Sequence, residues 1–296
     1  MSDQFASPVE PLIEASPDAS DRRRSPPAFM STTPNDPPWG VSQALLIWVI
    51  SIALLFIVPL LAIIPYVLYR FLLYGSVEGL GTDANLIFIS IISVLPAHIL
   101  TFLIIWFMVT NRGGRAFWQT FGWTWPENFG PWKTIGLALG LFVLAGFITW
   151  LVGGSETQLD QVINSSLRAR FATAFLAAAT GPLVEELIYR GVLYSALQRA
   201  MGMIWAVAVV SILFAGVHVL QYYKNLGVIA VIVILSVSLT LVRAFTGRLL
   251  PSYVMHLVFN GIQALYLVLQ PFVGKPSVEK NAAVGFIIHN LSRLLS

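Results

Sequence analysis

Three short polar motifs in the C-terminal half of this 296-residue chain carry side chains that hydrolytic chemistry requires. They are Glu-Glu-Leu-Ile-Tyr-Arg at residues 185–190, Phe-Ala-Gly-Val-His at 214–218 and His-Leu-Val-Phe-Asn at 256–260. Carboxylates and imidazoles accept and deliver protons, and both can bind metal ions. Because an ionisable side chain in an apolar, membrane-spanning stretch is costly, each one is a functional candidate.

The first motif gives its two glutamates different surroundings. On a helix, Glu186 and Arg190 lie one turn apart and can form an ion pair, whereas Glu185 points about 100° away. We expect Pro182 to open or kink this helix, which would place both carboxylates near its first-turn amides. Glu185 then has no partner on its own helix and is suited to act as a general base on water. The alternative is a structural ion network that locks helices together.

The other two motifs place imidazoles in later apolar stretches. His256 and Asn260 are four residues apart and therefore share one helix face. At 1.5 Å per residue, Glu185 and His218 lie about 21 and 22 Å from the cytoplasmic ends of their helices, but His256 lies only about 10 Å from its own. We expect Glu185 and His218 to share a water molecule, with His256 less well matched. A histidine in a membrane can instead be an interhelical hydrogen-bonding group, and we expect this of His98.

Seven apolar stretches long enough to cross a membrane must position these motifs. They fall near residues 43–69, 85–110, 133–153, 171–199, 203–223, 226–246 and 249–270. Residues 282–295 form a shorter apolar segment, expected to be a tilted eighth helix or one at the membrane surface. The sequence therefore predicts an all-α, polytopic transmembrane helical bundle of seven or eight spans.

The composition excludes several other classes of protein. Hydrophobic residues make up 57% of the chain and charged residues 10%, whereas a soluble domain carries about 25% charged residues. The absence of cysteine excludes a disulfide-stapled module, and the scattered basic residues do not form a nucleic-acid-binding surface. No internal repeat is visible, which disfavours a transporter built from duplicated halves.

Residues 1–40 form a proline-rich tail that we predict to be disordered, because it can bury little apolar area. The basic residues near the predicted spans indicate a cytoplasmic N-terminus. With that orientation the cytoplasmic group is Arg22, Arg23, Arg24, Arg112, Arg115, Lys133, Arg199, Arg243 and Arg248, and the opposite group is Arg70, Arg168, Arg170 and Lys224.

In their order, the three motifs resemble those of the CPBP family of intramembrane proteases. This family includes type II CAAX prenyl endopeptidases and bacteriocin-processing or self-immunity proteins, and the resemblance covers about residues 168–270. It implies proteolysis by an activated water molecule inside the membrane. The implied roles are water activation by Glu185 with help from His218, oxyanion stabilisation by His256 and Asn260, and shaping of the site by Glu186 and Arg190.

The resemblance leaves the cofactor open. Glu185, His218 and His256 could hold zinc or another divalent metal with one open position. The chain has no His-Glu-x-x-His motif, and the same residues can act without a metal. We slightly favour a metal-free glutamate mechanism.

The apolar stretches, the tail and the resemblance together predict an organisation and partners, with the resemblance bearing on the protease core. We divide the chain into the tail (1–40), N-terminal transmembrane helices (41–160), a protease core (161–275) and a short C-terminal helix (276–296). The expected partners are the lipid bilayer, in a bacterial plasma membrane, and a membrane-associated peptide or protein substrate. The alternative function is a non-enzymatic immunity or partner-binding protein, or a proton-coupled carrier, that uses the same buried polar residues.

Overall fold

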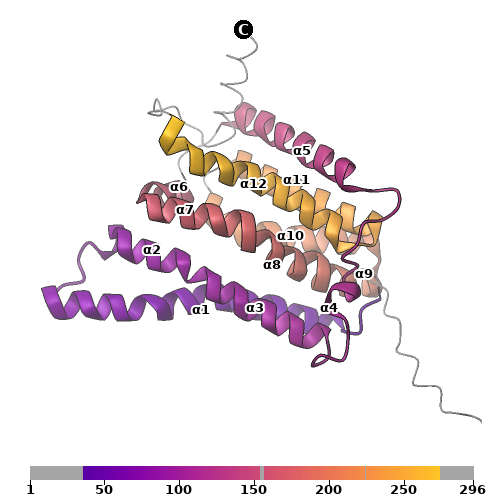
Figure 1. Cartoon of the computed structure of the whole chain (residues 1–296), viewed down its shortest axis with the longest axis horizontal. Helices are drawn as coiled ribbons and strands as arrows, with labels where there is room; N and C mark the ends of the chain where they lie inside the picture. Colours follow the sequence, from indigo (N-terminus) through magenta and orange to yellow (C-terminus); the bar gives the residue numbers. More distant parts are fainter. Residues whose placement is uncertain (1–35, 154–156, 224, 274–296) are drawn as a thin grey trace, which may run out of the picture. The chain divides into compact units, whose positions relative to one another are not determined.

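The computed structural model describes residues 36–153, 157–223 and 225–273, and every regular element within them is a helix (Figure 1). In chain order these are α1 (Val41–Tyr74), η2 (Leu80–Thr82), α2 (Ala84–Ile92), α3 (Val94–Val109), α4 (Phe117–Thr120), α5 (Pro131–Val152), α6 (Gln158–Asn164), α7 (Leu167–Phe175), η3 (Leu176–Thr180), α8 (Gly181–Glu186), η4 (Leu187–Leu193), α9 (Tyr194–Met201), α10 (Met203–Tyr222), α11 (Leu226–Thr246) and α12 (Leu249–Val273).

The predicted polytopic helical bundle is confirmed. Within the described residues, six helical runs are long and apolar enough to cross a membrane, and α10 contributes a shorter apolar stretch, Met203–Val219. The six are Val41–Tyr74, Ala84–Val109, Pro131–Val152, Leu167–Met201, Leu226–Thr246 and Leu249–Val273. The predicted C-terminal helix (276–296) and nearly all of the predicted tail (1–40) lie outside the described residues. The predicted domain boundary after residue 160 falls inside α6.

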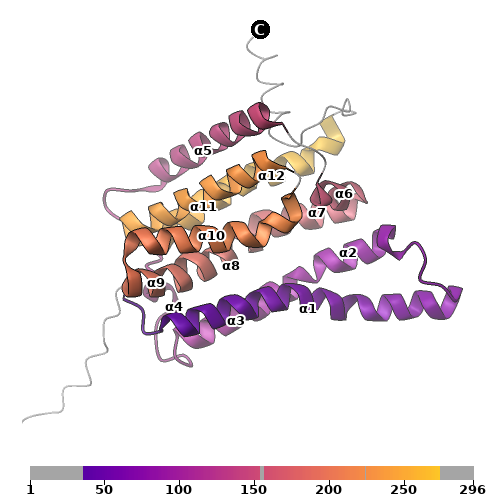
Figure 2. The same ribbon diagram turned by 180° about the vertical axis from the view of Figure 1, so that it is seen from behind.

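Helix α12 occupies the centre of the arrangement that carries the three motifs. It packs against α5 and α11 on one side and against α7, η3 and α8 on the other. Helix α10 packs along α11, whereas α1 packs with α2 and α3 (Figures 1 and 2). The motifs on α8, α10 and α12 are therefore brought together by neighbouring helices.

The run from α7 to α9 is one helix that widens to a π-helical pitch in two separate segments. Its η3 and η4 segments are π-helical, and they flank the short α-helical turn that holds Pro182 and both glutamates. A proline inside an α-helix lacks an N–H and clashes with the carbonyl four residues earlier, and the wider turn of η3 relieves this conflict. Pro182 therefore does not open a helix. The prediction that the glutamates lie on a helix's first turn is wrong, because η3 and α7 precede them without a break.

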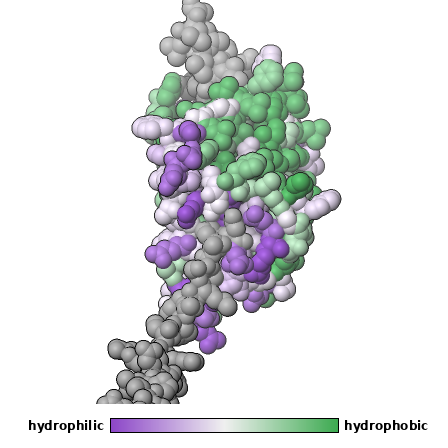
Figure 3. All heavy atoms as spheres, turned by 90° about the vertical axis from the view of Figure 1, so that its right-hand side faces the viewer, coloured by the Kyte–Doolittle hydropathy of each residue, from purple (hydrophilic) through white to green (hydrophobic). Residues whose placement is uncertain are grey.

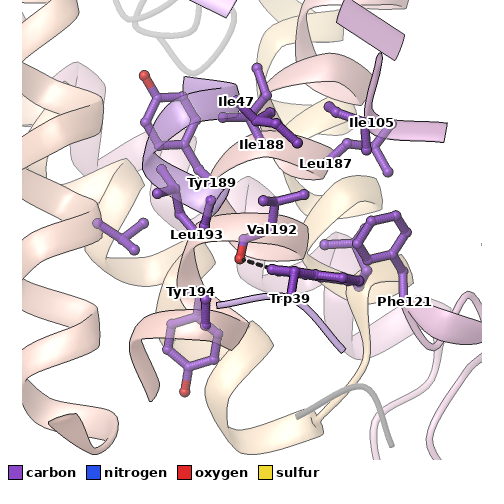
Figure 4. Packing of buried hydrophobic residues seen from close by; sticks show 14 of the residues in the cluster. Trp39, Ile47, Ile105, Phe121, Leu187, Ile188, Tyr189, Val192, Leu193 and Tyr194 are labelled. Carbon is purple, nitrogen blue, oxygen red and sulfur yellow. Dashed lines mark hydrogen bonds between the residues drawn. The ribbon is translucent and has the colours of Figure 1, made fainter. Parts of the chain in front are cut away.

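The second π-helical segment is held by an anchor from the start of the described chain. Trp39 is buried, stacks at a tilt against Phe121 and donates its indole N–H to the Val192 carbonyl at 3.1 Å (Figure 4). Ser195 donates its hydroxyl to the Gly191 and Val192 carbonyls. Side chains thus donate hydrogen bonds to the Gly191 and Val192 carbonyls, in a segment whose π-helical pitch disturbs the regular backbone pairing.

Most of the predicted cytoplasmic charges lie at one end of the bundle. Arg112, Arg115, Lys133, Arg199 and Arg248 flank the connections α3–α5, α9–α10 and α11–α12 at the right of Figure 1. Figure 3 looks onto this end and shows hydrophilic residues over its left and lower parts, with apolar residues at the upper right.

Arg243 corrects the count of loop charges. It lies in the last turn of α11 with no exposed surface, and its guanidinium lies 5.6 Å from the centre of the Tyr194 ring. It is therefore a buried residue of the bundle and not a loop charge. Because Arg243 lies close to the end of α11, the sequence alone does not distinguish it from the basic residues of the following loop.

The tight fit between η4 and Phe121 predicts a difference between two glycines. A Cβ at Gly191 would lie 2.8 Å from the Phe121 ring, whereas one at Gly140 of α5 would meet nothing within 4 Å. Since overpacking a buried contact costs about 1–3 kcal/mol, Gly191→Ala should lower the thermal unfolding midpoint of the detergent-purified protein. Gly140→Ala serves as the control and should leave it unchanged or raise it. Equal midpoints for the two variants would contradict the packing described.

Candidate active site

A buried charge cluster joins the first and third motifs. One oxygen of Glu186, Oε1, accepts hydrogen bonds from the Arg190 guanidinium at 2.9 Å and from Nδ1 of His256 at 3.1 Å. Glu186 and Arg190 have no exposed side-chain surface, and His256 has 1%. The predicted ion pair on one helix face is therefore present, and it extends to α12.

Arg190 also ties α8 and η4 to α11 and α10. It donates from Nε to the Thr240 hydroxyl at 3.2 Å and from one terminal nitrogen to the Ser236 carbonyl and hydroxyl, both at 3.0 Å. Its guanidinium carbon lies 4.7 Å from the centre of the Phe214 ring. A buried guanidinium is tolerated when its donors are satisfied, which this arrangement achieves.

Sequence reasoning missed Ser236 and Thr240, although they carried a signal. Together with Arg243 they recur at four- and three-residue spacing on an otherwise apolar helix and so form one polar stripe. All three are buried. Such a stripe inside a membrane span requires a polar partner on a neighbouring helix.

Of the two adjacent glutamates, Glu185 is the one whose carboxylate is accessible. Its side chain is 29% exposed, and its Oε2 lies 3.6 Å from Nε2 of His256. His256 therefore stands between two carboxylates, with Nδ1 toward Glu186 and Nε2 toward Glu185. The prediction that the two glutamates face different environments agrees with this geometry.

His256 lies beside Glu185, with 3.6 Å between Nε2 and Oε2. The predicted mismatch in depth between these two residues is therefore wrong. Leu249, the first residue of α12, is fully buried, and its N–H bonds to the carbonyls of Phe121 and Gly122 at 3.1 and 3.3 Å. A count of residues from a helix end does not show how far along its neighbours that helix is placed.

Asn260 satisfies a backbone carbonyl of η3. Its side-chain amide donates to the Ala177 carbonyl at 3.1 Å. The Gly181 N–H bonds to the Leu176 carbonyl instead, and residue 182, a proline, has no N–H to offer. His256 and Asn260 thus face the same helical run, as their spacing predicts, but they bind different parts of it.

His218 lies on α10 and is joined to the cluster through an aromatic ring. Its Nδ1 is 2.8 Å from the Phe214 carbonyl, and its ring packs on Phe214 with centres 4.8 Å apart. Phe214 in turn makes an edge contact with His256, with centres 6.2 Å apart. Among the described residues, His218 forms no ion pair with Glu185.

The expected metal ligands do not form a three-ligand group. Within the described ranges, no set of three or more His, Asp or Glu side chains is arranged to hold a metal ion. Glu185 and His256 are adjacent, but His218 is directed toward its own helix backbone. The described side chains in this arrangement therefore do not fit a metal centre.

His98 has its predicted interhelical role. Its Nδ1 lies 2.9 Å from the Thr180 hydroxyl, which links α3 to the end of η3. Sequence spacing could not reveal this partner, because the two residues lie on separate helices.

Comparison with known proteins agrees with the motifs. Residues 167–262 match the model of the family described as type II CAAX prenyl endopeptidase Rce1-like. This matched segment contains all three motifs. The membrane-embedded CAAX protease MroQ of Staphylococcus aureus (strain USA300) is a relative that is 26% identical over 173 residues, covering 54% of this chain and 65% of MroQ. The chain thus spans slightly less than two thirds of that relative, and no solved structure matches it significantly.

The role of Asn260 at η3 leads to a double-variant prediction. Asn260→Ala leaves the Ala177 carbonyl without its donor, which should destabilise the protein by about 1–3 kcal/mol. Pro182→Ala restores a backbone N–H near that carbonyl. The free energy of unfolding should therefore fall less in the double variant than in Asn260→Ala alone. Thermal unfolding in detergent measures both effects.

Gln263→Ala is the matched control, since this amide contacts a carbonyl of its own helix, that of Phe259. Gln263→Ala should lower the thermal unfolding midpoint less than Asn260→Ala does. Strictly additive effects of Pro182→Ala and Asn260→Ala would contradict a shared partner at Ala177.

Proposed function

We propose that this protein is an intramembrane endopeptidase that hydrolyses a peptide bond of a membrane-associated substrate with a glutamate-activated water molecule. The observation that carries the proposal is the accessible Glu185 carboxylate beside Nε2 of a buried histidine, within the segment that matches the family model. Its neighbour Glu186 is sealed in an ion pair and has no accessible surface with which to meet a substrate.

In the proposed reaction, Glu185 takes a proton from water as the water oxygen adds to the substrate carbonyl carbon. The negative charge that develops on the carbonyl oxygen needs nearby donors. His256, oriented by Glu186 through Nδ1, is one such donor when Nε2 carries a proton, and the second amide hydrogen of Asn260 is another. Glu185 then returns the proton to the leaving nitrogen as the C–N bond breaks. His218, from α10, assists Glu185 in this scheme.

The proposed substrate is a peptide held at the membrane, and a prenylated CAAX sequence is the first to test. The named activities of the family model and of MroQ support this choice. We also propose a bacterial plasma membrane location with a cytoplasmic N-terminus. The excess of basic residues at the end of the bundle that holds Arg199 and Arg248 supports this orientation.

The role of Glu185 predicts that Glu185→Gln abolishes cleavage without unfolding the protein. Loss of a general base typically lowers the rate by about 10²–10⁴-fold. The measurement is turnover by purified protein of internally quenched CAAX peptides, with and without a farnesyl group on the cysteine. His218→Ala should also lower turnover strongly.

Glu78→Gln is the control, because Glu78 lies in an exposed loop. It should retain full activity, and all variants should keep the wild-type unfolding midpoint to within a few degrees. Retained turnover by Glu185→Gln would refute the mechanism. A cellular phenotype fully supported by that variant would favour a non-enzymatic function.

A separate prediction concerns the metal. Because the described carboxylates and imidazoles form no three-ligand group, cleavage should survive dialysis of the purified protein against a chelator. Turnover of the same peptide before and after dialysis is the measurement. Loss of activity that zinc restores would show instead that a metal completes the site.

A further inference from the structure

Helix α1 contacts the fourth span through a tryptophan that lies outside the segment matching the family, residues 167–262. Trp48 donates its indole N–H to the Tyr189 hydroxyl at 3.1 Å. An indole N–H can only donate, so the hydroxyl oxygen is the acceptor in this bond. Tyr189 belongs to η4, against which α1 packs. The bond therefore ties α1 to the helix that carries both glutamates, across 141 positions of the chain.

The Tyr189 ring in turn packs on Phe214 of α10. The two residues are nearly buried, with exposed fractions of 4% and 2%. Their rings meet edge to face with centres 5.0 Å apart, which is a favourable geometry for two aromatic groups. Tyr189 is thus held at its hydroxyl by α1 and along its ring by α10, so the two contacts together restrict where Phe214 can lie.

Phe214 contacts both histidines of the proposed reaction. The centre of its ring lies 4.8 Å from that of His218 and 6.2 Å from that of His256. His256 is also bonded to Glu186, whereas His218 Nδ1 meets only a carbonyl of its own helix, that of Phe214. Among the described residues, His218 forms no hydrogen bond or ion pair with another helix. Its place relative to Glu185 therefore depends on how Phe214 packs.

We propose that the Trp48–Tyr189 pair positions the His218 imidazole in the proteolytic site. The indole bond fixes Tyr189, whose ring limits where Phe214 can lie, and His218 follows Phe214 by one helical turn. In this scheme neither member of the pair touches the reacting atoms. The inference rests on the proposed function, in which His218 assists Glu185, and it gives α1 a part in aligning a site whose motifs all lie on later helices.

Two substitutions remove this hydrogen bond from opposite ends. Trp48→Phe and Tyr189→Phe each keep an aromatic ring but lose one partner of the bond. Each should lower kcat for the quenched peptide about 10-fold with little change in KM, because a small displacement of a reacting group slows a reaction strongly. The double variant should be no slower than the slower single variant, since both changes remove one bond. Wild-type kcat in Trp48→Phe, or effects that multiply in the double variant, would overturn the proposal.

The matched controls are Trp150→Phe in α5 and Tyr69→Phe in α1. Both residues are largely exposed, at 65% and 56%, and in the described structure neither side chain makes a hydrogen bond. The controls should keep the wild-type kcat, and all four single variants should unfold within a few degrees of the wild type. A control that loses as much kcat as Trp48→Phe would contradict a role specific to the bonded pair.

Imidazole signals test the same inference without any cleavage. The chain has four histidines, so the C–H signals of isotope-labelled rings in detergent micelles can be assigned by single substitutions. The ring current of Phe214 acts on the His218 signals, which should therefore shift in Trp48→Phe and in Tyr189→Phe. The His98 signals serve as an internal control and should stay in place, because that ring is bonded to Thr180.

The two experiments fail in different ways. Absence of cleavage by the wild-type protein counts against the proposed function and leaves the imidazole signals to decide the positioning role. His218 signals that stay unchanged in both variants overturn the inference about the Trp48–Tyr189 pair, whatever the activity.

Discussion

The buried contact between Glu186 and Arg190 is the interaction on which the site depends. It places a full ion pair in a region without exposed surface, where partners from three neighbouring helices stabilise it. His256 comes from α12, Ser236 and Thr240 come from α11, and the Phe214 ring comes from α10. Removing either charge alone would leave the other buried without its partner, at a cost of about 3–5 kcal/mol. The pair thus fixes the positions of the helices that carry the other two motifs.

The ion pair also gives the two adjacent glutamates separate roles. Glu186 is committed to Arg190 and His256, and this holds the imidazole with its Nε2 toward Glu185. Glu185 keeps part of its surface exposed. A carboxylate that is partly accessible and lies beside an oriented histidine fits the proposed role of a general base. The structural network that the sequence offered as an alternative to catalysis is therefore present around Glu186, and it supports the position of Glu185.

The irregular backbone of the fourth span serves the same arrangement. Pro182 is accommodated by the π-helical η3, and Asn260 bonds to the Ala177 carbonyl that this irregularity leaves without an N–H donor. The second π-helical segment, η4, includes Arg190 and is held by Trp39 through Val192. In a membrane, unsatisfied backbone groups have no water to bind, so such irregularities persist only where side chains from other helices satisfy them.

The sequence by itself determined the class of fold and the approximate spans, and it supplied the candidate residues of the proposed site. Long apolar stretches can only be helices in a lipid bilayer, and the few ionisable residues within them are costly enough to mark function. Helical spacing was also sufficient to pair Glu186 with Arg190 and to place His256 and Asn260 on one face. Tertiary structure decided what spacing cannot encode. His256 lies beside Glu185 although the residue counts differ, the helix continues through Pro182, and Arg243 is buried despite its place near a helix end. The partners of Asn260, Arg190 and His98 lie 83, 46–50 and 82 residues away. Contacts over such separations depend on how helices pack, which the periodicity of a single helix does not specify.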